Sequence, residues 1–124
     1  MGRVLCACIL AGVAASCASE PPARITHTPA ERGRQVYEAL DCGSCHEASF
    51  RNFFRRVGPP LDHVGSVAAE RRPGMSAEDY LRESILDPGS YIVQGYPDAM
   101  PRGLTRDLSP EDLAALIAYL ESLR

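Results

Sequence analysis

Two cysteines and a histidine stand close together near the middle of the chain, in the run Cys42-Gly43-Ser44-Cys45-His46. A Cys-x-x-Cys-His motif is a signal for covalent attachment of a c-type haem. The spacing suits this chemistry, because two thiols so placed can add to two neighbouring vinyl groups on one edge of the macrocycle. The histidine that follows can then present its imidazole to the iron. The motif predicts one haem c, attached through Cys42 and Cys45, with His46 as an axial ligand.

The same residues have other possible uses: a disulfide, a thioredoxin-like redox pair, or part of a zinc site. Zinc would need a fourth ligand beside Cys42, Cys45 and His46, and the natural donors left are His27 and His63. A thioredoxin-like pair would accompany a βαβ pattern, which this sequence lacks. We therefore favour haem attachment.

The first residues have the character of an export signal. A short basic start, Met1-Gly2-Arg3, precedes an apolar run over residues 4–15 that is too short to span a bilayer comfortably. Small residues then lead to Cys17 in a sequence similar to a bacterial lipoprotein box. We predict a signal peptide over residues 1–17, with Cys17 as the site of lipid attachment. Ordinary cleavage after Ala18 is the alternative.

The rest of the chain divides into a tether and a domain. Residues 18–28 are polar, contain proline and show no periodicity, which is typical of a flexible linker. Residues 29–124 are expected to form the domain. Covalent haem attachment in bacteria takes place outside the cytoplasm, so we expect an exported protein on the periplasmic face, anchored in the membrane by acyl chains on Cys17. The formal net charge of −3 does not favour a nucleic-acid-binding protein, because such proteins usually carry an excess of basic residues.

Hydrophobic periodicity and capping residues predict helices and no strands. Thr28 can cap a first helix, with Pro29 in its first position, and Ser109 can cap the last one, with Pro110 following it. The predicted helices cover about residues 29–41, a short turn within 61–70, a segment from Ser76 to about Leu86, and a segment from Ser109 to the C-terminus. The sequence therefore predicts an all-α fold with long loops.

The pattern resembles the class I cytochrome c family from about residue 29 to the C-terminus. Members of that family carry Gly-x-x-x-aromatic in the helix before the haem motif, matched here by Gly33 and Tyr37. They place a leucine and an aromatic residue in the last helix, matched here by Leu116 and Tyr119. The resemblance implies a small cytochrome c fold in which the N- and C-terminal helices cross around one covalently bound haem, with Gly33 permitting a close approach.

The resemblance also implies the surroundings of the iron. The family's Gly-Pro-x-Leu appears as Gly58-Pro59-Pro60-Leu61, and it implies that the carbonyl of Pro59 accepts a hydrogen bond from His46 and so fixes the imidazole. The family's axial methionine lies in a late loop and is often followed by proline, as Met100 is by Pro101. Met75, just before a predicted helix, is interpreted as an apolar gap filler.

His63 and His27 are the remaining histidines. His63 could compete as an axial ligand, but the family layout puts it on the same side as His46, and we interpret it as a surface or loop residue. His27 falls in the tether, where we expect it to be solvated.

Ligation by His46 and Met100 would fill both axial positions and raise the reduction potential relative to bis-histidine ligation. The expected function is electron transfer, one electron at a time, between membrane or periplasmic redox partners, without catalysis and without a small-molecule substrate. One alternative is a cytochrome c subunit of a larger oxidoreductase complex, such as a terminal oxidase, a dehydrogenase or a sulfur-oxidising system. Another is an enzyme or gas sensor in which Met100 is not bound.

Residues 50–56, Phe-Arg-Asn-Phe-Phe-Arg-Arg, concentrate basic and aromatic side chains. They could steer an acidic partner toward the haem edge. Alternatively, the phenylalanines pack on the haem while the arginines are simply solvated.

Overall fold

Short capped helices joined by irregular connections make up the described part of the chain. The computed structural model describes residues 28–47 and 57–124. Over these ranges there is no strand, and the helices are α1 (Pro29–Ala39), α2 (Gly43–His46), α4 (Val64–Arg71), α5 (Ala77–Leu86) and α6 (Pro110–Ser122). The prediction of an all-α fold is confirmed.

Side-chain caps fix where the longer helices begin. Thr28 accepts a hydrogen bond from the backbone N–H of Glu31 at 3.2 Å, and the Glu31 carboxylate accepts one from the Thr28 N–H at 2.6 Å, which forms a capping box. Ser109 likewise accepts from the N–H of Asp112 at 3.0 Å. The same pairing starts α5, with a serine cap and an aspartate three residues on. These caps satisfy backbone donors that helix starts leave unpaired.

Helix ends differ from the sequence prediction in small ways. α1 stops at Ala39 instead of residue 41, because the chain turns sharply there. The segment predicted as a short turn is a full eight-residue helix, α4. The haem motif itself forms one helical turn, α2, which the sequence pattern did not predict.

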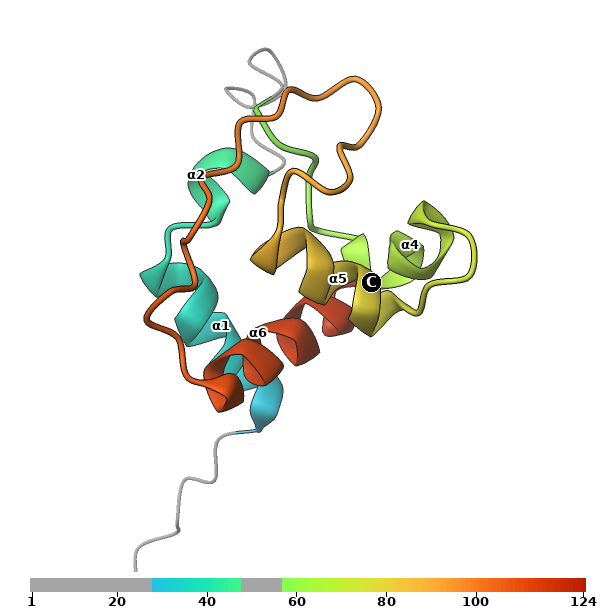
Figure 1. Cartoon of the computed structure of the whole chain (residues 1–124). Helices are drawn as coiled ribbons and strands as arrows, with labels where there is room; N and C mark the ends of the chain where they lie inside the picture. Colours follow the sequence, from blue (N-terminus) through green and yellow to red (C-terminus); the bar gives the residue numbers. More distant parts are fainter. Residues whose placement is uncertain (1–27, 48–56) are drawn as a thin grey trace, which may run out of the picture.

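α1 and α6 cross at close range, as Figure 1 shows. A Cβ atom on Gly33 would overlap the backbone carbonyl of Ala115 and lie 2.7 Å from the Cβ of Tyr119. The rings of Tyr37 and Tyr119 meet edge to face, with centroids 5.4 Å apart. The crossing predicted from Gly33, Tyr37 and Tyr119 is therefore present between the first and last helices.

The core lies along α6, between α1 on one side and α4 with α5 on the other. Ile117 is its most completely buried large side chain. α4 reaches the end of α6 through a hydrogen bond from the N–H of Gly65 to the carbonyl of Leu123 at 2.8 Å. The buried cluster comprises Val36, Val64, Ala68, Tyr80, Leu81, Leu113, Leu116, Ile117 and Leu120.

A long connection, residues 87–109, joins α5 to α6 without regular secondary structure. In Figure 1 it leaves α5, rises beside α2 and returns along α1 to the start of α6. We call this segment the Met100 loop. Residues of this loop and residues of α2 line one cavity, which is described next.

Candidate functional site

A tight turn carries the chain from α1 into the cysteine motif. Asp41 has a φ of 53°, in the left-handed region that aspartate tolerates better than most residues with a Cβ. Its carbonyl accepts hydrogen bonds from the backbone N–H of Ser44 at 3.1 Å and from the Ser44 hydroxyl at 2.7 Å. The N–H of His46 then bonds the Cys42 carbonyl at 3.1 Å. This turn presents Cys42, Cys45 and His46 together on one cavity.

His46 is held by the segment that follows the motif. Its Nδ1 lies 2.7 Å from the carbonyl oxygen of Pro59, which can only accept, so Nδ1–H is the donor. The backbone N–H of Leu61 donates to the His46 carbonyl at 3.1 Å. With its proton on Nδ1, a neutral imidazole keeps the Nε2 lone pair for a metal.

Close packing supports the same orientation. A Cβ on Gly58 would lie 2.8 Å from Cε1 and 2.9 Å from Nδ1 of His46, so a residue without a side chain is required there. Burial lowers the pKa of His46, although the hydrogen bond to Pro59 acts in the opposite direction. Burial therefore favours the neutral imidazole, which is the form that binds metals.

A cavity of about 290 Å³ lies beside this histidine, near the lower end of the roughly 300–1,000 Å³ range of cofactor and ligand sites. Its lining includes Cys42, Cys45, His46 and Met100. Burial raises the pKa of the Cys42 thiol. Most of the remaining lining is apolar and comes from Leu40, Val57, Leu61, Val64, Leu81, Ile85, Ile92, Val93, Leu104 and Leu120.

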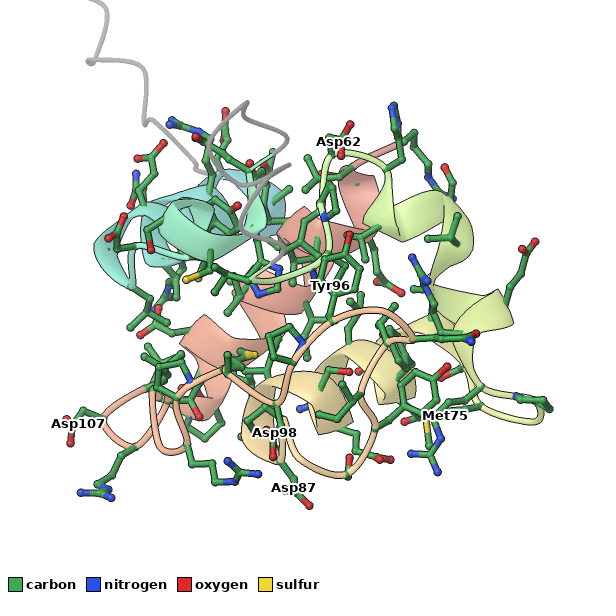
Figure 2. The ribbon with its side chains drawn as sticks, turned by 90° about the horizontal axis from the view of Figure 1, so that it is seen from above. Asp62, Met75, Asp87, Tyr96, Asp98 and Asp107 are labelled. Atoms are coloured by element: carbon green, nitrogen blue, oxygen red, sulfur yellow. The ribbon has the colours of Figure 1, made fainter. Side chains whose placement is uncertain are left out.

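The two methionines of the described residues have different surroundings. Met100 lines the same cavity as the cysteine motif. Met75 does not line it and packs instead against the hydrophobic core. Figure 2 shows Met75 at the α4–α5 edge of the molecule, away from α1. Of these two thioethers, Met100 alone shares a cavity with His46.

Tyrosine rings form part of the same cavity. Tyr80 is buried, and its ring meets that of Tyr91 edge to face at a centroid distance of 6.0 Å. Both rings line the cavity, as does Tyr96, which Figure 2 labels on the Met100 loop. The sequence prediction did not find this aromatic wall, because Tyr80 and Tyr91 lie on different segments and share no periodicity.

The described residues also bear on the alternative uses of the motif. No disulfide joins Cys42 to Cys45. No cluster of three or more His, Cys, Asp or Glu side chains suited to a metal occurs within 28–47 and 57–124. His63 is exposed, lies 3.4 Å from the Asp62 carboxylate and does not line the cavity.

The donor set fits a covalently attached haem. Two thiols can bond covalently to the macrocycle, while an imidazole and a thioether that line the same cavity can ligate its iron. Hard cations such as Mg²⁺ or Ca²⁺ prefer oxygen ligands and are poorly matched to this apolar lining. Fold and site together define a class: a small helical protein built to hold a c-type haem.

The comparison with known families agrees with this class. Residues 30–124 match the sequence profile of the family described as cytochrome c. The chain belongs to the cytochrome c family. It is also 33% identical over 99 residues to "Cytochrome c oxidase subunit 2" of Alkalihalophilus pseudofirmus. That match covers 80% of this chain and 27% of the relative, so the chain spans only about a quarter of that longer protein.

Family membership establishes the general chemistry. Members bind haem c covalently, with its iron, and transfer electrons to and from redox partners. They form a family of electron carriers, and their domains typically function outside the cytoplasm.

Several predicted features lie outside the described residues: the signal peptide over residues 1–17 with Cys17, nearly all of the tether including His27, and the basic and aromatic run over 50–56. Among the residues that the structure does describe, no helix has the length and apolar character needed to cross a membrane.

Proposed function

We propose that this protein carries single electrons through one haem c attached at Cys42 and Cys45, with His46 and Met100 as its axial ligands. The observation that carries the proposal is that all four side chains line one largely apolar cavity. The hydrogen bond between His46 and the Pro59 carbonyl adds support, because such a contact fixes a ligating imidazole and strengthens its donation to the iron.

The bound haem supplies an iron that alternates between the ferric and ferrous states. Met100 offers a soft thioether, which favours the ferrous state and raises the reduction potential relative to a second histidine. The apolar lining keeps water from the reacting centre, so a change of one charge requires little rearrangement of solvent. With both axial positions filled, this site has no place for a substrate, and we propose a non-catalytic role.

An absorption spectrum of the purified ferric protein tests the ligand assignment. The sulfur-to-iron charge-transfer band should be present in the wild type, absent in Met100→Ala and retained in Met75→Ala. If carbon monoxide binds readily to the reduced wild type, the claim that protein ligands fill both axial positions is wrong. On a denaturing gel, the haem should stay with the protein. Loss of the haem would refute covalent attachment and would favour the zinc alternative.

We further propose that the protein is exported and held at the periplasmic face by lipid on Cys17, with residues 18–28 as a tether. The small residues before Cys17 support this proposal. Cys17→Ser should move the haem protein from the membrane fraction to the soluble fraction. Mass spectrometry of the mature N-terminus distinguishes a lipidated Cys17 from cleavage after Ala18.

A second candidate role is that of a cytochrome c subunit in a larger oxidoreductase. The similarity to a protein named cytochrome c oxidase subunit 2 favours it, although that protein is about four times longer than the matched part. Purification separates the two roles. A stoichiometric partner that stays bound in high salt supports the subunit, whereas a protein that elutes alone supports a carrier between membrane or periplasmic partners.

A further inference from the structure

The Met100 loop has no regular secondary structure, and backbone hydrogen bonds such as those from Tyr96 to Val93 and from Arg106 to Gly103 close local turns within it. Side-chain contacts connect these turns to one another and to the helices. Asp98 and Arg102 stand two residues before and two residues after Met100. A guanidinium N–H of Arg102 donates to the carboxylate of Asp98 at 2.7 Å. This ion pair therefore closes a short arc of chain that has Met100 at its centre.

Arg102 also reaches the beginning of the loop. A Cβ atom placed on Gly89 would overlap the terminal nitrogen of the Arg102 guanidinium, so this side chain packs directly on the Gly89 backbone. The Met100 arc and the first residues after α5 are therefore in contact. The absence of a side chain at Gly89 makes that contact possible.

The residue after Gly89 is bound to α5, and α5 is bound to the end of α4. The Ser90 hydroxyl donates to a carboxylate oxygen of Glu83 at 2.5 Å. Arg72 pairs with the same oxygen, and its guanidinium carbon lies 5.6 Å from the centre of the Tyr91 ring. At that distance a guanidinium gains a cation–π attraction. One carboxylate thus joins α4, α5 and the start of the loop.

These contacts form a continuous path from the helices to the methionine. We propose that they act as an anchor that positions the Met100 sulfur for the iron and limits its release. We call this set the loop anchor; its members are Arg72, Glu83, Gly89, Ser90, Asp98 and Arg102. The proposal rests on Met100 being the axial ligand, as proposed above.

The two ion pairs of the loop anchor differ in exposure. The side chains of Arg72 and Glu83 are 35% and 28% exposed, whereas those of Arg102 and Asp98 are 60% and 46% exposed. Water and salt screen exposed pairs strongly, while a half-buried charged group with two hydrogen bonds contributes more. Replacing Glu83 should therefore release the Met100 sulfur from the iron more often than replacing Arg102 does.

The test uses the holoprotein and follows the sulfur-to-iron band and the helical circular dichroism on heating. Glu83→Gln should raise the fraction of molecules that lack the band, below global unfolding, by about tenfold. Arg102→Gln should raise it by up to about fivefold. Gly89→Ala, which displaces Arg102 without touching Met100, should resemble Arg102→Gln. Ser90→Ala provides a milder disruption should Glu83→Gln fold poorly.

Two exposed i,i+4 pairs outside the anchor give matched controls. Glu78→Gln breaks a pair with Arg82 on the outside of the same helix α5, and Arg34→Gln breaks a pair with Glu38 on α1. Neither should change the band. Amide hydrogen exchange over residues 89–102 gives a readout independent of the iron, and it should accelerate in the anchor variants only.

The outcomes separate this proposal from the ligand assignment. A wild-type protein without the band would refute Met100 as the ligand, and with it the effect of the anchor on ligation. A wild-type protein with the band, whose anchor variants match Glu78→Gln and Arg34→Gln in both band loss and exchange, would refute the loop anchor and leave the ligand assignment standing.

Discussion

The cavity is lined by one segment that carries His46 and by another that carries Met100, here called the His46 wall and the Met100 wall, and the chain builds them in different ways. Around His46, the contacts are made by backbone groups of the segment that follows the motif: the Pro59 carbonyl and the Leu61 N–H bond to it, and the Gly58 backbone packs on its ring. Around Met100, the chain makes local turns and depends on exposed side chains for longer contacts. Backbone groups therefore hold His46 in place, whereas the charged ends of side chains hold the segment around Met100.

This difference predicts unequal stability. Local opening is easiest where few apolar groups are buried and where hydrogen bonds face solvent. Asp98, Ala99 and Pro101 around Met100 are exposed, whereas Gly58 beside His46 is buried. We therefore expect the Met100 wall to open first, with His46 still in place. The following variants test this comparison, beginning with the largest expected effect.

Gly58→Ala should damage the His46 wall. The new Cβ would press on the imidazole and lie 3.1 Å from the Cys45 carbonyl, and neither group can move freely. Overpacking of this kind costs about 1–3 kcal/mol of unfolding free energy, measurable by denaturant unfolding of the holoprotein. Gly43→Ala is the control, because its nearest neighbour is the flexible end of Glu47. Equal unfolding midpoints for the two variants would contradict the close packing.

Gly103→Ala should weaken the Met100 wall. Gly103 has a φ of 81°, and placing a side chain in that conformation costs about 1 kcal/mol. The sulfur-to-iron band should then disappear at a lower temperature, with a smaller shift in helix melting. Gly74→Ala is the matched control, since Gly74 has a φ of 80° but lies between α4 and α5. Identical band loss in both variants would show that the strain is not local to Met100.

The Tyr37–Tyr119 contact should stabilise both walls equally, because it joins the crossing helices that support the whole domain. A double-mutant cycle with Tyr37→Leu and Tyr119→Leu should give a coupling of about 0.5–1.5 kcal/mol. The order in which band and helix signals disappear on heating should not change. If either variant reversed the order in which the two signals disappear, the tyrosine pair would be stabilising one wall more than the other. Burial raises the pKa of Tyr37 to about 12, so its phenol should stay protonated through these measurements.

Asp112 should give the smallest effect, and one that depends on pH. A hydrogen bond from Arg32, at 2.7 Å, and a second from Ser109 hold the pKa of this carboxyl below its usual value of 3.8. A carboxyl whose pKa is lower in the folded state stabilises the fold above its ordinary pKa, and this stabilisation disappears as the pH falls through the folded value.

Asp112→Asn should therefore lower the melting temperature slightly at neutral pH, and its difference from the wild type should shrink as the pH falls below the ordinary carboxyl pKa of 3.8. Melting curves across this range provide the measurement, with Asp107→Asn in the Met100 loop as the control. A difference that persisted in acid would mean that the pair with Arg32 is not responsible.

Much of the scaffold was predictable because its signals are local. Thr28 and Ser109 cap helices within a few residues of themselves, and Gly33 marks a helix crossing through its lack of a side chain. The turn at Asp41 was not predictable in the same way, since aspartate only tolerates its backbone conformation and does not require it. The shape of α2 follows from that turn.

The sequence by itself determined the chemistry of attachment, since Cys42, Cys45 and His46 lie so close along the chain that their relative placement is nearly set by covalent geometry. It also offered two methionines, Met75 and Met100, and the family resemblance, not spacing alone, favoured the second. Only the tertiary structure decided which of them shares the cavity with His46 and how its loop is held. Arg72 and Asp98 lie far apart in sequence, and only the packing of α4, α5 and the Met100 loop makes them ends of one path.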